Sequence, residues 1–103
     1  MTRIETTLDE TLAERGSKYG DFFGYAALSQ NIKLFMHAAL RNNTRFKSLP
    51  TAQQLVVLEG LDMIAVKLAR ICNGDPAYED SWLDIEGYSR ITRERVCSKG
   101  DDK

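Results

Sequence analysis

The stretch that decides the fold is residues 51–87, TAQQLVVLEGLDMIAVKLARICNGDPAYEDSWLDIEG. Its first part is apolar on nearly every side of a helix. This predicts a long, buried helix that begins at Thr51, with Gln54 in a capping box, and ends at Gly74 as a left-handed cap. Gly60 inside it indicates close packing against a neighbouring helix. The stretch therefore predicts the centre of an all-α bundle. Its excess of apolar surface also predicts an interface between protomers.

Four carboxylates interrupt this apolar region. Glu59 and Asp62 are three residues apart on the central helix, and Asp80 and Asp84 are four apart on a last helix expected over about 79–96. Each spacing places its pair on one helical face. Facing carboxylates repel one another unless a cation lies between them, and Mg²⁺ and Mn²⁺ prefer oxygen ligands. The two pairs therefore form a candidate metal site.

Two basic residues follow the first pair along the central helix. Lys67 and Arg70 lie one and two turns beyond Asp62, where they could neutralise the charge of a phosphate. A plainer interpretation is also open. Glu59 and Asp62 would pair with these cations or with a neighbouring helix, and Asp80 would only be an acid at a helix start.

The N-terminal half predicts two further helices. The first is expected over Thr7–Arg15, with Thr7 as its N-cap and Gly16 ending it. The glycine-rich segment that follows reads as a loop, with Asp21 as N-cap of the next element. A three-four apolar repeat predicts the second helix over about 22–41, and residues 42–50, NNTRFKSLP, read as a loop.

The segment ERGSKYGDF at 14–22 has two interpretations. Lys18 could contact the phosphates of a nucleotide while Tyr19 stacks on its base. Alternatively, Tyr19, Phe22 and Phe23 close the end of the bundle. His37 has no nucleophile or second ligand near it in the sequence, and we expect a packed or surface histidine.

Length and composition limit the classes of function. The chain has 103 residues, 43% hydrophobic and 28% charged, which predicts one helical domain over 1–96 and a polar, disordered tail over 97–103. A net charge of −1 gives no reason to expect nucleic acid as a partner. No apolar run approaches the roughly 20 residues of a membrane span, and the start lacks the features of a secretory signal.

Three segments carry a resemblance to a known family: ERGSKYGDF at 14–22, LDMIAVKLARICNGDP at 61–76 and DSWLDIEGY at 80–88. They resemble small MazG-like proteins encoded by tailed phages and prophages. These proteins are similar to the all-α nucleoside triphosphate pyrophosphohydrolases, the superfamily of MazG and the dimeric dUTPases. The resemblance covers most of the chain, in order.

This resemblance implies a homo-oligomeric helical bundle in the cytoplasm of a bacterial host. Acids from two helices would bind Mg²⁺ or Mn²⁺ and cleave a nucleotide between its α- and β-phosphates, giving monophosphate and pyrophosphate. The implied metal ligands are Glu59, Asp62, Asp80 and Asp84. The implied catalytic residues are Glu59, Asp62 and Asp84, and the implied substrate-binding residues are Lys18, Tyr19, Lys67 and Arg70.

The acidic motifs depart from the family pattern, which is E-E-x-x-E followed by E-x-x-D. The family pattern starts with two adjacent glutamates, whereas here Leu58 precedes Glu59. Asp80 and Asp84 are four residues apart instead of three. Two alternatives therefore stay open. The chain is a non-catalytic phage accessory protein that sequesters a nucleotide or inhibits a host defence protein, or it is a structural oligomer whose acids are paired internally.

Overall fold

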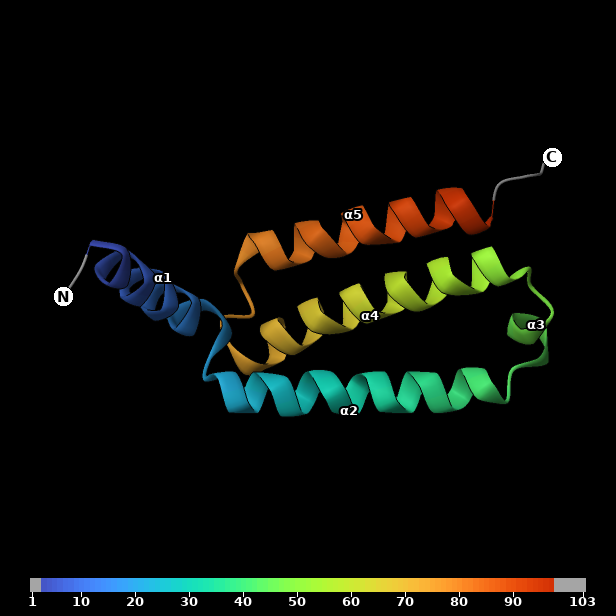
Figure 1. Ribbon diagram of the computed structural model, residues 1–103, viewed down its shortest axis with the longest axis horizontal. Helices are drawn as coiled ribbons and strands as arrows, with labels where there is room; N and C mark the ends of the chain where they lie inside the picture. Colours follow the sequence, from blue (N-terminus) through green and yellow to red (C-terminus); the bar gives the residue numbers. More distant parts are fainter. Residues whose placement is uncertain (1–2, 98–103) are drawn as a thin grey trace.

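The computed structural model describes residues 3–97, with side chains from residue 7 onward, and this part of the chain forms helices only (Figure 1). The helices are α1 (Arg3–Tyr19), α2 (Phe22–Arg41), α3 (Thr44–Lys47), α4 (Thr51–Asn73) and α5 (Glu79–Val96). The predicted all-α fold is confirmed, with five helices. Residues 98–103 of the predicted tail lie outside the described residues.

The long helices form a layer with α4 in the middle. α2 and α5 pack along opposite sides of α4, α1 extends beyond one end, and α3 lies at the other (Figure 1). The molecule measures 56 × 27 × 27 Å and its radius of gyration is 17.1 Å. A compact domain of this length has a radius of gyration of about 13 Å. The chain is therefore elongated, and its helices leave broad faces uncovered.

Small residues on α4 bring its neighbours close. Ala65 and Ala69, four residues apart on one face, are fully buried. A Cβ at Gly60 would lie 2.1 Å from Oγ1 of Thr92 on α5, so a larger residue would require Thr92 to move. The close packing predicted at Gly60 is confirmed.

The interior of a single chain is small. Among the described residues, the buried hydrophobic side chains are Ala65, Ala69 and Ile71 alone. α4 is not buried nearly all round as its sequence predicted, because Leu55 is 62% exposed and Leu68 is also exposed. The layer covers the sides of α4 that face α2 and α5 and leaves other sides open.

The first helix is longer than its sequence predicted. α1 begins before Thr7, which is therefore inside the helix, and it continues through Gly16 to Tyr19. A glycine in a helix costs only about 1 kcal/mol relative to alanine, so Gly16 did not end it. The chain turns at Gly20, whose φ of +81° is left-handed. Asp21 then caps α2 as predicted, its carboxylate accepting a hydrogen bond from the Gly24 N–H at 3.1 Å.

The connection between α2 and α4 contains the short helix α3 where a loop was predicted. Asn43 caps it by accepting a hydrogen bond from the Phe46 N–H. The predicted capping box of α4 is wrong, because Thr51 is already helical and Pro50 precedes it without a side-chain cap. Gln54 donates instead to the Leu49 carbonyl at 2.9 Å.

The predicted left-handed cap at Gly74 is also wrong. Its φ is −129°, which is not left-handed. Glycine is required there for space, because a Cβ would lie 2.1 Å from the carbonyl oxygen of Lys18. The end of α4 thus rests directly against the end of α1.

Candidate functional site

Three of the four predicted substrate-binding residues lie together where α1 meets the end of α4. The Arg70 guanidinium carbon is 4.4 Å from the ring centroid of Tyr19 and 5.6 Å from that of Tyr25. Lys18 Nζ is 5.0 Å from the ring centroid of Tyr78, which contacts Tyr19 edge-on at 6.1 Å. We call these five residues the basic–aromatic cluster. Each cation is held over a ring face, the favoured geometry for this contact.

Hydrogen bonds between distant parts of the chain hold this cluster in place. The Asn73 amide donates to the carbonyl oxygens of Tyr19 at 2.9 Å and Asp21 at 3.0 Å. The Asp75 N–H donates to the Lys18 carbonyl at 2.7 Å. The backbone that carries Lys18 and Tyr19 is therefore fixed by the end of α4.

A hollow of about 390 Å³ adjoins the cluster. It is lined by Tyr19, Phe22, Tyr25, Arg15 and Arg70, among other residues of α1, α2 and α4. Aromatic rings can stack on a nucleotide base, and guanidinium groups bind phosphate through several N–H donors at once. The hollow thus combines the two kinds of group that a nucleotide requires.

Lys67, the fourth predicted substrate-binding residue, is engaged elsewhere. It is buried, and its ammonium forms an ion pair with Asp84 of α5 at 2.9 Å. A buried ammonium requires a partner, so this pair joins α4 to α5. Asp84 remains about half exposed.

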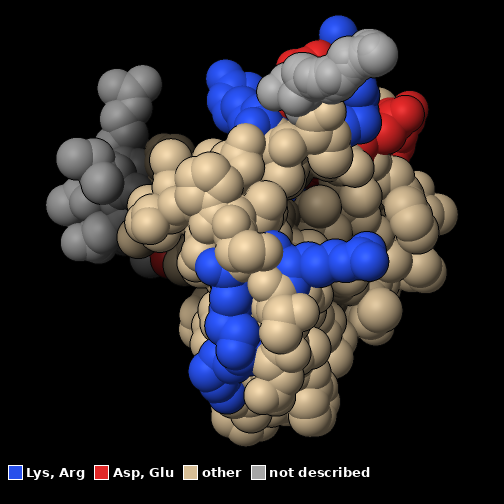
Figure 2. Space-filling view, turned by 90° about the vertical axis from the view of Figure 1, so that its right-hand side faces the viewer, with Lys and Arg blue, Asp and Glu red and all other residues tan. Residues whose placement is uncertain are grey.

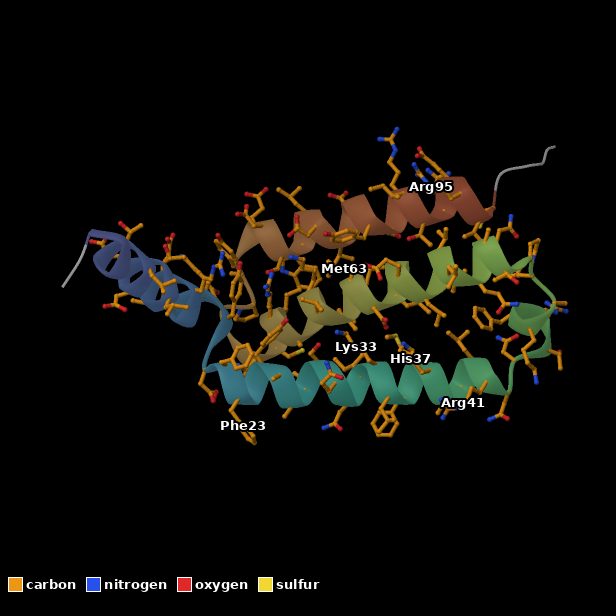
Figure 3. All side chains as sticks on the ribbon, in the orientation of Figure 1. Phe23, Lys33, His37, Arg41, Met63 and Arg95 are labelled. Atoms are coloured by element: carbon orange, nitrogen blue, oxygen red, sulfur yellow. The ribbon has the colours of Figure 1, made fainter. Side chains whose placement is uncertain are left out.

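The other three carboxylates also have separate surroundings. Asp62 Oδ1 lies 2.7 Å from Nε2 of His37, which extends from α2 toward α4 (Figure 3). Asp80 accepts a hydrogen bond from the Tyr78 hydroxyl at 3.1 Å, and this bond raises the pKa of Tyr78. Glu59 lines a hollow of about 310 Å³ between α4 and α5.

These placements do not assemble the predicted metal site within one chain. In residues 3–97, no group of three or more His, Cys, Asp or Glu side chains is arranged to hold a metal ion. Mg²⁺ needs near-octahedral coordination and is held by carboxylates together with water and substrate phosphates. The carboxylates of one chain, divided between His37, Lys67 and Tyr78 as partners, do not fit that requirement.

A second concentration of positive charge lies at the α3 end of the layer. No Asp or Glu occurs from Phe22 to Leu58, and Arg41, Arg45 and Lys47 lie in this stretch. Figure 2 looks at this end and shows Lys and Arg side chains there. Within the described residues these three side chains have no ion pair and no ring contact. It is a solvated basic surface, unlike the basic–aromatic cluster.

Sequence reasoning missed His37, Tyr25 and Tyr78. His37 of α2 contacts Asp62 of α4, and the local sequence around either residue does not predict this contact. Tyr25 is part of the apolar repeat of α2, which by itself indicates packing. Tyr78 could have been noticed, since it lies between the two C-terminal segments that carry the MazG-like resemblance.

Comparison with protein-family models, with curated proteins and with solved structures gives no match for this chain. Among the described helices, none is both long enough and apolar enough to cross a membrane. The placement of the side chains is therefore the main guide to function.

Proposed function

We propose that this chain binds a nucleoside triphosphate in the hollow beside the basic–aromatic cluster. We further propose that, with Mg²⁺ or Mn²⁺, it hydrolyses the nucleotide to monophosphate and pyrophosphate, as the MazG-like resemblance implies. The observation that carries the proposal is the convergence of Lys18, Tyr19 and Arg70 from distant parts of the chain. The cytoplasm of a bacterial host and a homo-oligomeric assembly belong to the same proposal.

The roles follow from the chemistry of each side chain. The Tyr19 and Tyr25 rings offer faces on which a base can stack, at about 1–3 kcal/mol per base. Arg70 is already oriented by these rings, so little side-chain entropy is lost when it contacts a phosphate. Lys18, held over Tyr78, supplies a second positive charge to the phosphate chain.

The hydrolytic part of the proposal rests on the resemblance. Glu59, Asp62, Asp80 and Asp84 are the acids that would carry it, and one chain does not gather them. We therefore assign no reaction step to a bound ion. A second candidate, nucleotide capture without cleavage, is favoured by this separation of the acids. A phage accessory protein that withholds a nucleotide or inhibits a host defence protein would act in this way.

Calorimetry with nucleoside triphosphates tests the binding site. We expect Arg70→Gln to weaken binding at least tenfold, about 1.4 kcal/mol, because it removes the charge between the two rings. Arg90→Gln is the matched control, since Arg90 is exposed on α5 and pairs with Glu94. Equal affinities for both variants, or no binding of any nucleotide at millimolar concentration, would exclude the proposed site.

Release of pyrophosphate, with Mg²⁺ and with a chelator, separates the two candidates. We expect turnover to depend on the metal and to be lost in Asp84→Asn, with thermal unfolding measured alongside because Lys67 loses its partner. Nucleotide binding without pyrophosphate release, under every metal condition, selects the capture protein.

A further inference from the structure

Helix α1 contains a glycine that no packing contact explains. Gly16 lies inside this helix, where glycine costs about 1 kcal/mol relative to alanine. At Gly20, Gly60 and Gly74 a Cβ would overlap an atom of another helix, whereas no atom lies within 4 Å of a Cβ at Gly16. Gly16 lines the hollow of about 390 Å³ beside the basic–aromatic cluster. Its missing side chain therefore leaves space in the wall of that hollow.

The wall that α1 contributes is a single helical face. It consists of Leu12, Arg15, Gly16 and Tyr19. Their spacing places them within an arc of about 100°. Leu12 precedes Gly16 by about one turn, and Tyr19 follows it by about one turn. We call the space over Gly16, between the side chains of Leu12 and Tyr19, the α1 slot.

The length of the α1 slot suits one flat ring. At about 1.5 Å of rise per residue, Leu12 and Tyr19 are about 10 Å apart along the helix axis. Carbon atoms in contact are separated by about 3.5–4.0 Å, so a ring that touches a side chain on each face needs about 7–8 Å. A planar base fits this space, and a side chain at Gly16 would reduce it.

Both walls of the hollow offer apolar surface that this chain does not cover. Leu12 on the α1 wall is 56% exposed, and Phe22 on the α2 wall is 78% exposed. The Phe22 ring lies 5.9 Å from that of Tyr25, which also lines the hollow. Small-molecule sites have volumes of about 300–1,000 Å³ and combine apolar walls with a few polar groups. The hollow has both properties.

The polar groups of the hollow include two arginines from different helices. Arg15 follows from α1, next to Gly16, and Arg70 from α4. Arg70 is held over the Tyr19 ring, whereas Arg15 has no ion pair and no ring contact within the described residues. Arg15 is therefore available to a ligand. Guanidinium groups bind phosphate oxygens through several N–H donors, so two of them can hold one phosphate chain.

We propose that the base of the nucleotide lies in the α1 slot, flat against Gly16 between Leu12 and Tyr19, with its phosphate chain at Arg15 and Arg70. This inference rests on the proposed nucleotide binding and adds the position of the base and a role for Arg15. The Gly16 carbonyl already accepts a hydrogen bond from the Gly20 N–H at 3.0 Å. The slot thus offers space and stacking, which every base can use, so purine and pyrimidine nucleotides should both bind.

The proposal predicts that one substitution at Gly16 changes stability and affinity in opposite directions. Alanine favours a helix, so Gly16→Ala should raise the melting temperature. Its methyl group occupies part of the α1 slot, so nucleotide binding should weaken about tenfold. A glycine without a role in binding would give the first change and not the second.

Calorimetry and thermal unfolding test this prediction, with Gly87→Ala as the matched control. Gly87 lies inside α5, no atom is within 4 Å of a Cβ there, and it does not line this hollow. Gly87→Ala should raise the melting temperature in the same way and keep the nucleotide affinity of the unmodified chain. Inorganic triphosphate, which has no base, should not distinguish the unmodified chain from either variant.

Arg15→Gln tests the position of the phosphates. It should weaken the binding of both a nucleoside triphosphate and inorganic triphosphate about tenfold, because it removes one of the two guanidinium groups. Arg90→Gln on α5 should leave both affinities unchanged. Unchanged affinities for Arg15→Gln would overturn the phosphate part of the proposal.

The outcomes separate this inference from the proposed function. If the unmodified chain binds nucleotide and Gly16→Ala binds it equally well, the α1 slot is wrong and the nucleotide site stands. An equal loss of nucleotide and inorganic triphosphate in Gly16→Ala would also overturn the slot, because the base would not be the group affected. If the unmodified chain binds no nucleotide, both proposals are wrong.

Discussion

The two ends of the helical layer are closed in different ways. At the end that carries the basic–aromatic cluster, Asn73 and Asp75 bond to the backbone of residues far earlier in the chain. At the α3 end, hydrogen bonds join near neighbours: Asn43 with Phe46, and Gln54 with Leu49. One end is built by tertiary contacts and the other by local ones.

This difference indicates where a site can form. At the α3 end, hydrogen bonds between near neighbours reverse the direction of the chain. The Arg and Lys side chains around them remain exposed to solvent. Tertiary bonds fix separate segments relative to one another, so side chains from both can hold one ligand. Changes at the first end should therefore affect stability and binding together, and changes at the α3 end should affect stability slightly and binding not at all.

The largest effect is expected at Gly20. Gly20→Ala would place a Cβ 2.1 Å from the Asn73 carbonyl oxygen at a left-handed φ. The backbone strain and the overlap together should lower the free energy of unfolding by about 3 kcal/mol. Urea denaturation measures this loss.

Gly16→Ala is the matched control, because no atom lies within 4 Å of a Cβ there. It should raise the free energy of unfolding by up to about 1 kcal/mol, since alanine favours a helix. Similar values for the two variants would mean that the end carrying the basic–aromatic cluster is not held as tightly as its hydrogen bonds indicate.

A smaller effect is expected from Asn73→Ala. It removes two hydrogen bonds to the backbone of Tyr19 and Asp21, at a cost of about 1–3 kcal/mol. Amide hydrogen exchange should become faster around Gly20, and nucleotide affinity should fall with it. Unchanged exchange in that segment would show that the Asn73 side chain does not hold the contact between α1 and α4.

The smallest effect is expected at the α3 end. Asn43→Ala removes the cap of a four-residue helix and should lower the free energy of unfolding by about 1 kcal/mol or less. Calorimetry should give the same nucleotide affinity as the unmodified chain. Weaker binding would show that the two ends are coupled.

The same distinction explains what could be predicted from the sequence. The extent of α2 follows from its cap at Asp21 and its apolar repeat, which are local properties. α5 also covers the range expected from the sequence, although it has no side-chain cap at its start. α3 was missed because four residues are too few for a periodic pattern. The bounds of α4 were predicted correctly, whereas the end of α1 and the conformation of Gly74 were predicted wrongly. Both depend on the contact between α1 and α4, where Gly20 and Gly74 lie, and no local rule describes that contact.

The candidate site divides similarly. The resemblance grouped Lys18, Tyr19, Lys67 and Arg70 as substrate-binding residues. The structure places Lys18, Tyr19 and Arg70 together, whereas Lys67 pairs with Asp84. The pairings of Asp62 with His37 and of Asp84 with Lys67 arise from helix packing. Residue spacing indicates which acids share a face, whereas it does not indicate which partner that face meets.

Trp82, the only tryptophan of the chain, lies near the start of α5, and its indole N–H donates to the carbonyl of Pro76 in the connection between α4 and α5 at 2.8 Å. In the same connection, the Asp75 N–H donates to the backbone carbonyl of Lys18, and the Tyr78 ring lies 5.0 Å from Lys18 Nζ. A phosphate that draws the Lys18 ammonium away from the Tyr78 ring would disturb this connection and, through it, the indole. The intrinsic fluorescence of the unlabelled protein therefore offers an optical titration of the nucleotide site.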